Sequence, residues 1–139
     1  MEDESLAELF WSVARRLRHR SHESLQPLGI TPGQARALNV LARHGTMRPS
    51  EMSEHLKIAP RSTTEVVDGL EERGLVERLP DPADRRATLV ELTPSGGSVA
   101  GSIRAERGVE GERFFAALPP RDRAELARIL TALRVSEPP

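Results

Sequence analysis

Between Pro49 and Thr93 the sequence changes from a helical hydrophobic period to two short β-prone runs, and this change limits the folds open to the chain. The first part predicts a short helix, a tight turn and a longer helix that begins at Pro60. The second part predicts strands over 76–79 and 87–92, around a polar segment (80–86) rich in turn formers and charge. We therefore expect two helices followed by a hairpin, an arrangement suited to presenting the longer helix to the DNA major groove.

Each of the two predicted helices has one apolar face. In the first, Met52 and Leu56 lie one turn apart, and the helix is too short to persist without tertiary contacts. In the second, four residues at helical spacing are expected to face the core: Thr63, Val66, Val67 and Leu70. Gly74 is expected to end this helix, with Leu75 contacting Leu70 in a Schellman motif.

Amphipathic helices are predicted on both sides of this block. Residues 6–26 carry an apolar stripe, and Trp11 falls outside it. Thr31 and Gln34 are spaced for a capping box at the start of the next helix. The inward residues expected on that helix are Ala35, Leu38, Leu41 and Ala42. After Thr93 a glycine-rich helix is expected, and then a last helix with one apolar face: Leu126, Ile129, Leu130 and Leu133.

The whole pattern predicts a mainly α fold with a small β-hairpin, in three parts. These are an N-terminal dimerisation helix (1–30), a DNA-binding block (31–93) and C-terminal dimerisation helices (94–139). The apolar stripes at the two ends lie too far from the central block to be buried by it. We therefore expect an obligate homodimer through residues 1–25 and 95–135, because a two-fold interface buries both stripes and sets two DNA-contacting helices about 34 Å apart.

Composition excludes several classes of protein. The chain has no cysteine, which removes disulfides, thiolate metal sites and cysteine-based redox sensing. Its net charge is −1, so any DNA binding must come from local positive charge. The densest basic run, residues 15–20, is interpreted as a solvated helix face outside the DNA-binding block. Neither a signal peptide nor a long apolar run is present, and we expect a cytoplasmic protein without membrane contact.

Several segments resemble, in order and spacing, the MarR family of bacterial transcriptional regulators. They are Thr31–Gln34, Ser50–Met52, Val67–Arg78, Asp81–Arg86 and Val90–Gly96. The resemblance covers nearly the whole chain and implies a winged helix-turn-helix dimer. It implies binding to palindromic operators in double-stranded DNA, mostly as a repressor. It also implies release of DNA when a small phenolic or anionic ligand enters a cleft between the dimerisation helices and the DNA-binding lobe.

The resemblance assigns the recognition helix to Pro60–Arg73. Its outward positions near the start are Pro60, Arg61, Ser62, Thr64, Glu65 and Asp68. Arg61 is the candidate for a bidentate contact to guanine O6 and N7, with a phosphate contact as the alternative. Ser62 and Thr64 can donate to phosphates or base edges.

The hairpin carries the second group of candidate DNA contacts. The resemblance implies that Asp84 supports the wing and that its arginines, Arg85 and Arg86, lie at the tip. One of these two arginines is expected to approach DNA, and the sequence does not decide which of the two it is. Paired surface charges stabilise a fold by only about 0–1 kcal/mol, so charges at a hairpin tip are better explained by a binding partner.

Three positions depart from the family pattern. Glu65 stands where relatives carry polar or basic residues, and its carboxylate either repels phosphate or accepts from cytosine N4. Gly69 stands at a helix interior position often filled by Arg or Lys, which costs about 1 kcal/mol against Ala and is expected to remove a phosphate contact. Ala59 lacks a capping side chain. These changes predict moderate, salt-sensitive affinity.

A small organic effector is expected near Trp11, Arg15 and the start of the second helix, by analogy with the family. A metal-responsive regulator is an alternative, because His19 and His22 lie one turn apart beside Glu23. The sequence supplies no further ligands at recognisable spacing, and no metal or other cofactor is expected. The remaining histidines, His44 and His55, are interpreted as isolated.

The sequence also bears on two functions other than DNA binding. An enzyme is not expected, because the chain has no glycine-rich phosphate loop, nucleophile elbow or His-Glu-x-x-His pattern. A winged-helix protein-interaction module with little DNA binding remains open. The near-neutral charge, Glu65 and Gly69 favour that alternative.

Overall fold

The structure, a computed structural model, describes residues 3–136, so the outermost ends of the two predicted dimerisation segments lie outside it. In chain order its elements are α1 (Leu6–Leu25), a 3-10 turn η1 (Gln26–Leu28), α2 (Pro32–His44), α3 (Pro49–Leu56), α4 (Pro60–Glu72), β1 (Val76–Asp81), β2 (Asp84–Leu92), α5 (Pro94–Phe115) and α6 (Pro120–Val135). The fold is thus mainly helical with one antiparallel hairpin, as the sequence predicts.

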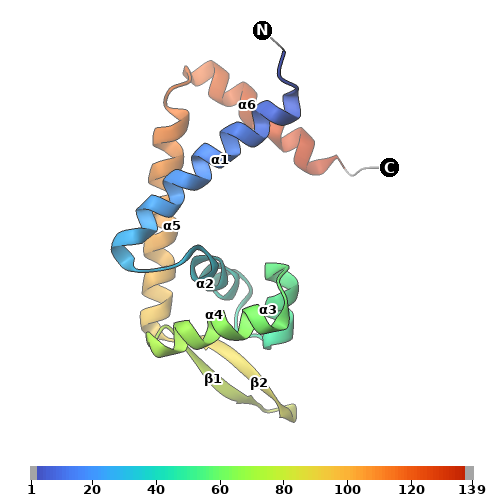
Figure 1. Cartoon of the computed structure of the whole chain (residues 1–139), viewed down its shortest axis with the longest axis vertical. Coiled ribbons are helices and arrows are strands. Elements are labelled where there is room, and N and C mark those ends of the chain that lie inside the picture. Colours follow the sequence, from blue (N-terminus) through green and yellow to red (C-terminus); the bar gives the residue numbers. More distant parts are fainter. Residues whose placement is uncertain (1–2, 137–139) are drawn as a thin grey trace.

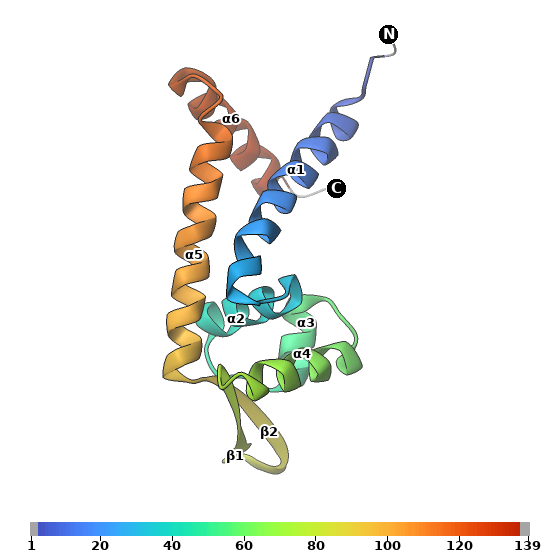
Figure 2. The same cartoon turned by 60° about the vertical axis from the view of Figure 1, so that its left-hand side comes forward.

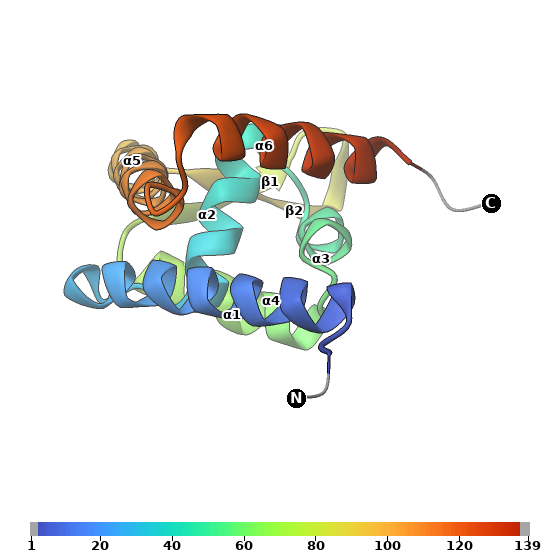
Figure 3. The same cartoon turned by 90° about the horizontal axis from the view of Figure 1, so that it is seen from above.

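The elements form a lobe with a long extension (Figure 1). The lobe holds α2, α3, α4 and the hairpin, and α5 runs out of it to meet α6, while α1 packs against α5. The hairpin projects past α4 on the side away from α1, α5 and α6 (Figure 2). Seen from above, α1 and α6 extend along opposite sides of the view, with α2 between them (Figure 3). No helix within residues 3–136 is long and apolar enough to span a membrane.

The hydrophobic core lies in the lobe. Its largest fully buried side chains come from three helices and two strands, and they are Leu38, Met52, Leu70, Val67, Val76, Val90 and Thr63. Burying one such apolar side chain stabilises the fold by roughly 1.5–3 kcal/mol. The extension differs, because α6 has no buried residue. The lobe therefore has its own core, and the outer half of the extension has none within this chain.

Helix α2 begins and ends close to the predicted positions. Thr31 caps it, since the Thr31 hydroxyl accepts from the Gln34 N–H and the Gln34 amide oxygen accepts from the Thr31 N–H, both at 3.1 Å. The expectation that Ala42 faces inward is wrong, because Ala42 is exposed in the last turn. Ala37 is buried instead. Since α2 contacts α3, α4, α5 and β2, it is buried on more than one face.

The hairpin is longer than the sequence predicts. Pairing runs from Val76 opposite Leu92 to Asp81 opposite Asp84, with an irregularity after Pro80. The predicted seven-residue connection therefore shrinks to two residues. Hydrogen bonds at the turn account for the difference, because the Asp81 carboxylate accepts from the Ala83 N–H at 2.9 Å.

Candidate nucleic-acid interface

The start of α4 is the most exposed part of the two-helix unit. Pro60 occupies the first turn, and the cap residue Ala59 provides no side-chain hydrogen bond, as expected. The side chains predicted to face outward are all exposed: Pro60, Arg61, Ser62, Thr64 and Glu65. The opposite face of the helix is buried at Thr63, Val67 and Leu70. Helix α4 therefore packs into the lobe along one face, and its opposite face is accessible to a partner.

Helix α3 holds this exposed end in place. The hydroxyls of Ser53 on α3 and Thr63 on α4 are 2.8 Å apart and share a hydrogen bond. Thr63 is fully buried, so this bond satisfies a polar group that would otherwise be costly inside the lobe. The Thr64 hydroxyl donates to the Pro60 carbonyl at 3.0 Å, which leaves its lone pairs available to accept.

Arg78 on β1 pairs with the acidic side of α4. Its guanidinium donates to Asp68 at 2.6 Å and to Glu71 at 2.8 Å. Asp68, predicted among the outward residues, is therefore engaged with the wing. The two bonds connect β1 to α4. The positive charge of Arg78 also compensates the negative charges of two carboxylates near the exposed face of α4.

The turn end of the wing is held by an ion pair between residues 33 positions apart, which no local sequence pattern indicates. Arg48, the residue before α3, donates from Nε and Nη2 to Oδ2 of Asp81 at 2.9 and 2.7 Å. The Asp81 side chain is only 9% exposed. The N–H of Ala83 and then Arg48 hold the pKa of Asp81 below its usual value. The hydrogen bond to Asp81 raises the pKa of the Arg48 guanidinium. A charge-assisted contact therefore connects α3 to the hairpin.

Asp84 lies at the tip of the hairpin. Its carboxylate accepts from the Arg86 N–H at 2.9 Å, a local bond that orders the start of β2. Arg85 and Arg86 are both exposed. The structure therefore brings two cations to the projecting end of the wing, on the same side of the lobe as α4 (Figures 1 and 2).

Gly69 lies on the side of α4 that approaches α2. A Cβ at Gly69 would lie 2.8 Å from Nε2 of Gln34 on α2, so this position faces the neighbouring helix. A larger residue there would require the flexible end of the Gln34 side chain to move. The sequence could not show this, because the contact joins two helices that are 35 positions apart.

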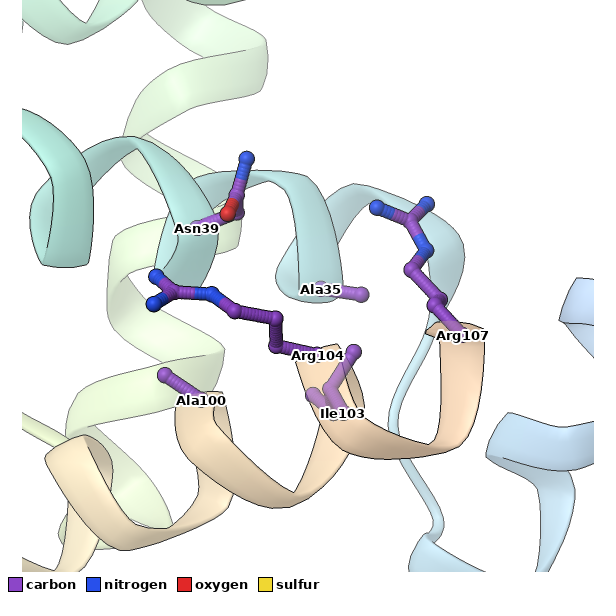
Figure 4. Close-up of a pocket in the computed structure, with 6 residues that line it drawn as sticks. All are labelled: Ala35, Asn39, Ala100, Ile103, Arg104 and Arg107. Carbon is purple, nitrogen blue, oxygen red and sulfur yellow. The ribbon is translucent and has the colours of Figure 1, made fainter. Parts of the chain in front are cut away.

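The residues predicted for an effector do not share a cavity. Trp11 is 58% exposed and packs edge-on against Phe10 with ring centroids 5.9 Å apart. Arg15 lines a shallow hollow formed by residues of α1 alone. A more enclosed cavity of about 80 Å³ lies between α2 and α5. Its lining residues are Ala35, Asn39, Ala100, Ile103, Arg104 and Arg107 (Figure 4).

The histidines are arranged differently from the expectation. His19 pairs with Glu23 at 3.1 Å on the same helix. His44 and His55 are not isolated, because their rings stack with centroids 4.2 Å apart. Between residues 3 and 136 the structure has no group of three or more side chains that could hold a metal ion.

An exposed second helix held by a short first helix, with a hairpin beside it, defines a winged helix-turn-helix DNA-binding lobe. The MarR family model matches residues 30–88. The transcriptional repressor MdtR of Bacillus subtilis is 30% identical over 111 residues, which are 80% of this chain and 72% of MdtR. Other curated relatives match over just under two thirds of their own length.

Solved structures agree with this classification. The apo form of wild-type MarR from E. coli superposes with a TM-score of 0.88 at 28% identity, over 96% of this chain and 98% of that one. The Mycobacterium tuberculosis MarR family protein RV2887, solved with salicylic acid, gives a TM-score of 0.77 at 26% identity, over 95% and 98% of the two chains. The chain belongs to the MarR family. It is a DNA-binding transcriptional regulator and not an enzyme.

Proposed function

We propose that this regulator is a homodimeric repressor that binds a palindromic operator through α4 and the wing, and leaves it when a small aromatic anion binds. The observation that carries the proposal is the exposed start of α4, where side chains able to contact bases lie opposite a fully buried face. Action on the chromosome also implies a place in the cytoplasm. The structural likeness to MarR and the sequence likeness to the repressor MdtR support this function.

Within each half-site, Arg61 contacts a guanine by its planar guanidinium, which matches O6 and N7. Ser62 contacts a neighbouring phosphate or base edge, and Thr64 accepts from a base amine or water. Pro60 supplies apolar contact at the groove edge. Glu65 accepts from cytosine N4, because a carboxylate facing phosphate would be repulsive. The exposure of the five side chains supports these roles.

The wing contacts the DNA beside the groove that α4 occupies. Arg85 or Arg86 enters the minor groove or binds its phosphates, since both project from the tip that Asp84 orders. The Arg48–Asp81 bond at the turn end of the hairpin supports a fixed orientation of the wing relative to α3. Wing and helix then act as a single rigid surface.

The second copy covers the extension. Large apolar side chains are exposed on α1 and α6: Leu6, Leu9, Phe10, Trp11, Val13, Ile129, Leu130, Leu133 and Val135. An apolar surface of this extent marks an interface. The two helices stand on opposite sides of the molecule as seen along the extension (Figure 3), so a two-fold partner can contact both. Light scattering at micromolar concentration is expected to give twice the chain mass, and a monomeric mass would exclude this arrangement.

The effector site proposed here is the cavity between α2 and α5 in place of the surface around Trp11 and Arg15. Arg104 and Arg107 come from α5 and flank an apolar floor that includes Ala35 of α2 (Figure 4). Two guanidinium groups beside an apolar surface suit a ring that carries a carboxylate. The salicylic acid bound to RV2887 supports an aromatic acid as the class of ligand.

The deciding experiment is protection mapping on the DNA upstream of the gene for this chain and its neighbours. We expect a protected palindrome with two half-sites about 34 Å apart, bound with strong salt dependence. Uniform, sequence-independent protection would contradict operator recognition. Failure to bind any DNA at low salt would favour a protein-interaction module instead.

A further inference from the structure

The residue that follows α4 reaches across to the end of α1. Arg73 donates from Nη1 to the Gly29 carbonyl at 2.5 Å and from Nη2 to the Leu28 carbonyl at 2.9 Å. These two carbonyls belong to the short connection between α1 and α2. A planar guanidinium spans two adjacent acceptors in one fixed geometry, which a single-point ammonium cannot do. The end of α4 and the end of α1 are therefore joined by two charge-assisted bonds.

The acceptor side of this contact is rigid. Gly29 has φ 65°, in the left-handed region, and a Cβ there would lie 3.4 Å from Nη1 of Arg73. Leu25, the last residue of α1, is buried with 2% exposure. The carbonyls that Arg73 binds thus follow a helix end that is itself anchored in the core.

The two residues after Arg73 are held by the start of α5. The Thr93 hydroxyl donates to the Gly74 carbonyl at 2.6 Å, and the Thr93 N–H donates to the Leu75 carbonyl at 3.1 Å. Gly96 permits this approach, since a Cβ there would lie 1.9 Å from the Leu75 carbonyl oxygen. Residues 73–75 are consequently fixed from one side by α1 and from the other by α5.

We propose that Arg73 is a positioning residue for operator binding, which fixes the angle between the recognition helix and α1 without touching DNA. This inference rests on the proposed function of a dimer that reads two half-sites. Arg61 and Arg73 stand 12 residues apart on α4, which is about 18 Å along the helix. Arg73 therefore lies at the end of the helix away from the candidate base contacts.

Because α4 is long, a small rotation at its Arg73 end moves the start of the helix by a larger distance. A rotation of about 10° around that end moves the start of α4 by about 3 Å, close to the 3.4 Å rise of one base pair. If α1 is fixed in the dimer interface, the contact made by Arg73 sets the separation of the two recognition helices. Loss of the contact is then expected to relax the choice of half-site spacing.

Two substitutions test this role. Arg73→Ala removes both bonds, and Arg73→Lys keeps the charge but cannot bind both carbonyls in the same geometry. Arg43→Ala is the matched control, because Arg43 is an exposed arginine on α2, outside the segments expected in the dimer interface. A phosphate-binding role for Arg73 predicts that Lys restores affinity and that Ala lowers the salt slope by about 0.9. A positioning role predicts that both variants behave alike and that the slope is unchanged.

The first measurement reads the angle without DNA. The chain has no cysteine, so Arg18→Cys on α1 and Glu77→Cys on β1 give two unique sites for spin labels. Labelled chain is diluted with excess unlabelled chain, and the distance distribution between the labels is recorded by pulsed EPR well below the melting temperature. We expect one narrow distribution for the parent and for Arg43→Ala, and a broader one for both Arg73 variants. Equally narrow distributions in all four proteins would overturn the proposal.

The second measurement reads the consequence on DNA. Unlabelled proteins are titrated against the mapped operator and against versions with one base pair added or removed between half-sites. We expect both Arg73 variants to lose at least about fivefold of the parent's preference for the natural spacing. A preserved spacing preference would overturn the positioning role even if affinity fell. A parent that binds no operator would refute the proposed function, while the EPR distances would still decide whether Arg73 fixes the helix angle.

Discussion

Arg48 and Asp81 lie 33 positions apart and connect the start of α3 to the turn end of the wing through Nε and Oδ2 at 2.9 Å. The Asp81 carboxylate also accepts from the Ala83 N–H, which forms the hairpin turn. One nearly buried carboxylate therefore shapes the turn and fixes the hairpin to the helix that precedes α4. Asp81 and Asp84 are partners across the last pair before the turn, but only Asp81 bonds to a residue outside the hairpin, since the bond of Asp84 is to Arg86.

Arg48→Ala is expected to weaken operator binding several-fold, because the turn end of the hairpin loses its ion pair with the start of α3 while Arg85 and Arg86 remain present. Gel-shift titration measures the change. Arg43→Ala, at an exposed position on α2, serves as the control and should bind like the parent. Equal affinity of Arg48→Ala and the parent would show that the wing keeps its orientation without the pair.

The Asp81 pair predicts a defined pH dependence of stability. The folded-state pKa of Asp81 lies below the ordinary value of 3.8, so its contribution is fully present above that value. The contribution is lost as pH falls through the lowered folded pKa. We expect Asp81→Asn to melt below the parent at pH 7 and the two curves to converge as pH falls well below 3.8. A difference that stays constant down to pH 2 would contradict this linkage.

Arg61→Ala and Arg86→Ala are both expected to weaken operator binding, for different reasons. Loss of a bidentate base contact costs about 1–3 kcal/mol and relaxes base preference at one half-site position. Loss of a wing cation weakens binding to all sequences alike and reduces the salt slope. Binding to a set of single-base operator variants measures both effects, with Arg85→Ala as the neighbouring comparison. Unchanged affinity in both variants would remove these residues from the interface.

Gly69→Ala and Gly101→Ala form a matched pair of helix substitutions. Alanine stabilises an open helix interior by roughly 0.5–1 kcal/mol over glycine. We expect that gain at Gly101, where nothing lies within 4 Å of the added Cβ. We expect little gain or a loss at Gly69, because Gln34 must move and its amide already caps α2 at Thr31. Denaturant unfolding measures both, and an equal gain at the two positions would exclude the close approach of α4 to α2.

Salicylate is expected to raise the melting temperature of the parent in proportion to its binding. Arg104→Ala and Arg107→Ala should lower that increase, since each removes a cation from the cavity between α2 and α5. Trp11→Ala and Arg15→Ala test the surface suggested by the sequence and should leave the increase unchanged. Thermal-shift titration decides between the two candidate sites. Loss of the response only in Trp11→Ala and Arg15→Ala would place the effector site on α1.

Local patterns predicted the elements of this fold, and tertiary contacts decided the details of its site. The buried and exposed faces of α4 follow from helical spacing around Thr63 and Val67, which requires no knowledge of neighbours. The roles of Arg48 and Arg73 depend on which loop each side chain meets, and no local pattern encodes that meeting. The contact between the Gly69 position and Gln34 is not encoded locally either, because the two residues are 35 positions apart. The capping box at Thr31 was predictable, since both partners lie within one turn.

Helix α6 buries none of its own residues within the chain. If its apolar face is covered only by a second copy, the ordering of α6 and the pairing of chains become one equilibrium governed by mass action. The amount of protein in the cell would then set the number of assembled repressors steeply, since assembly depends on the square of the free chain concentration. A repressor acting on its own gene would in that way sense its own abundance.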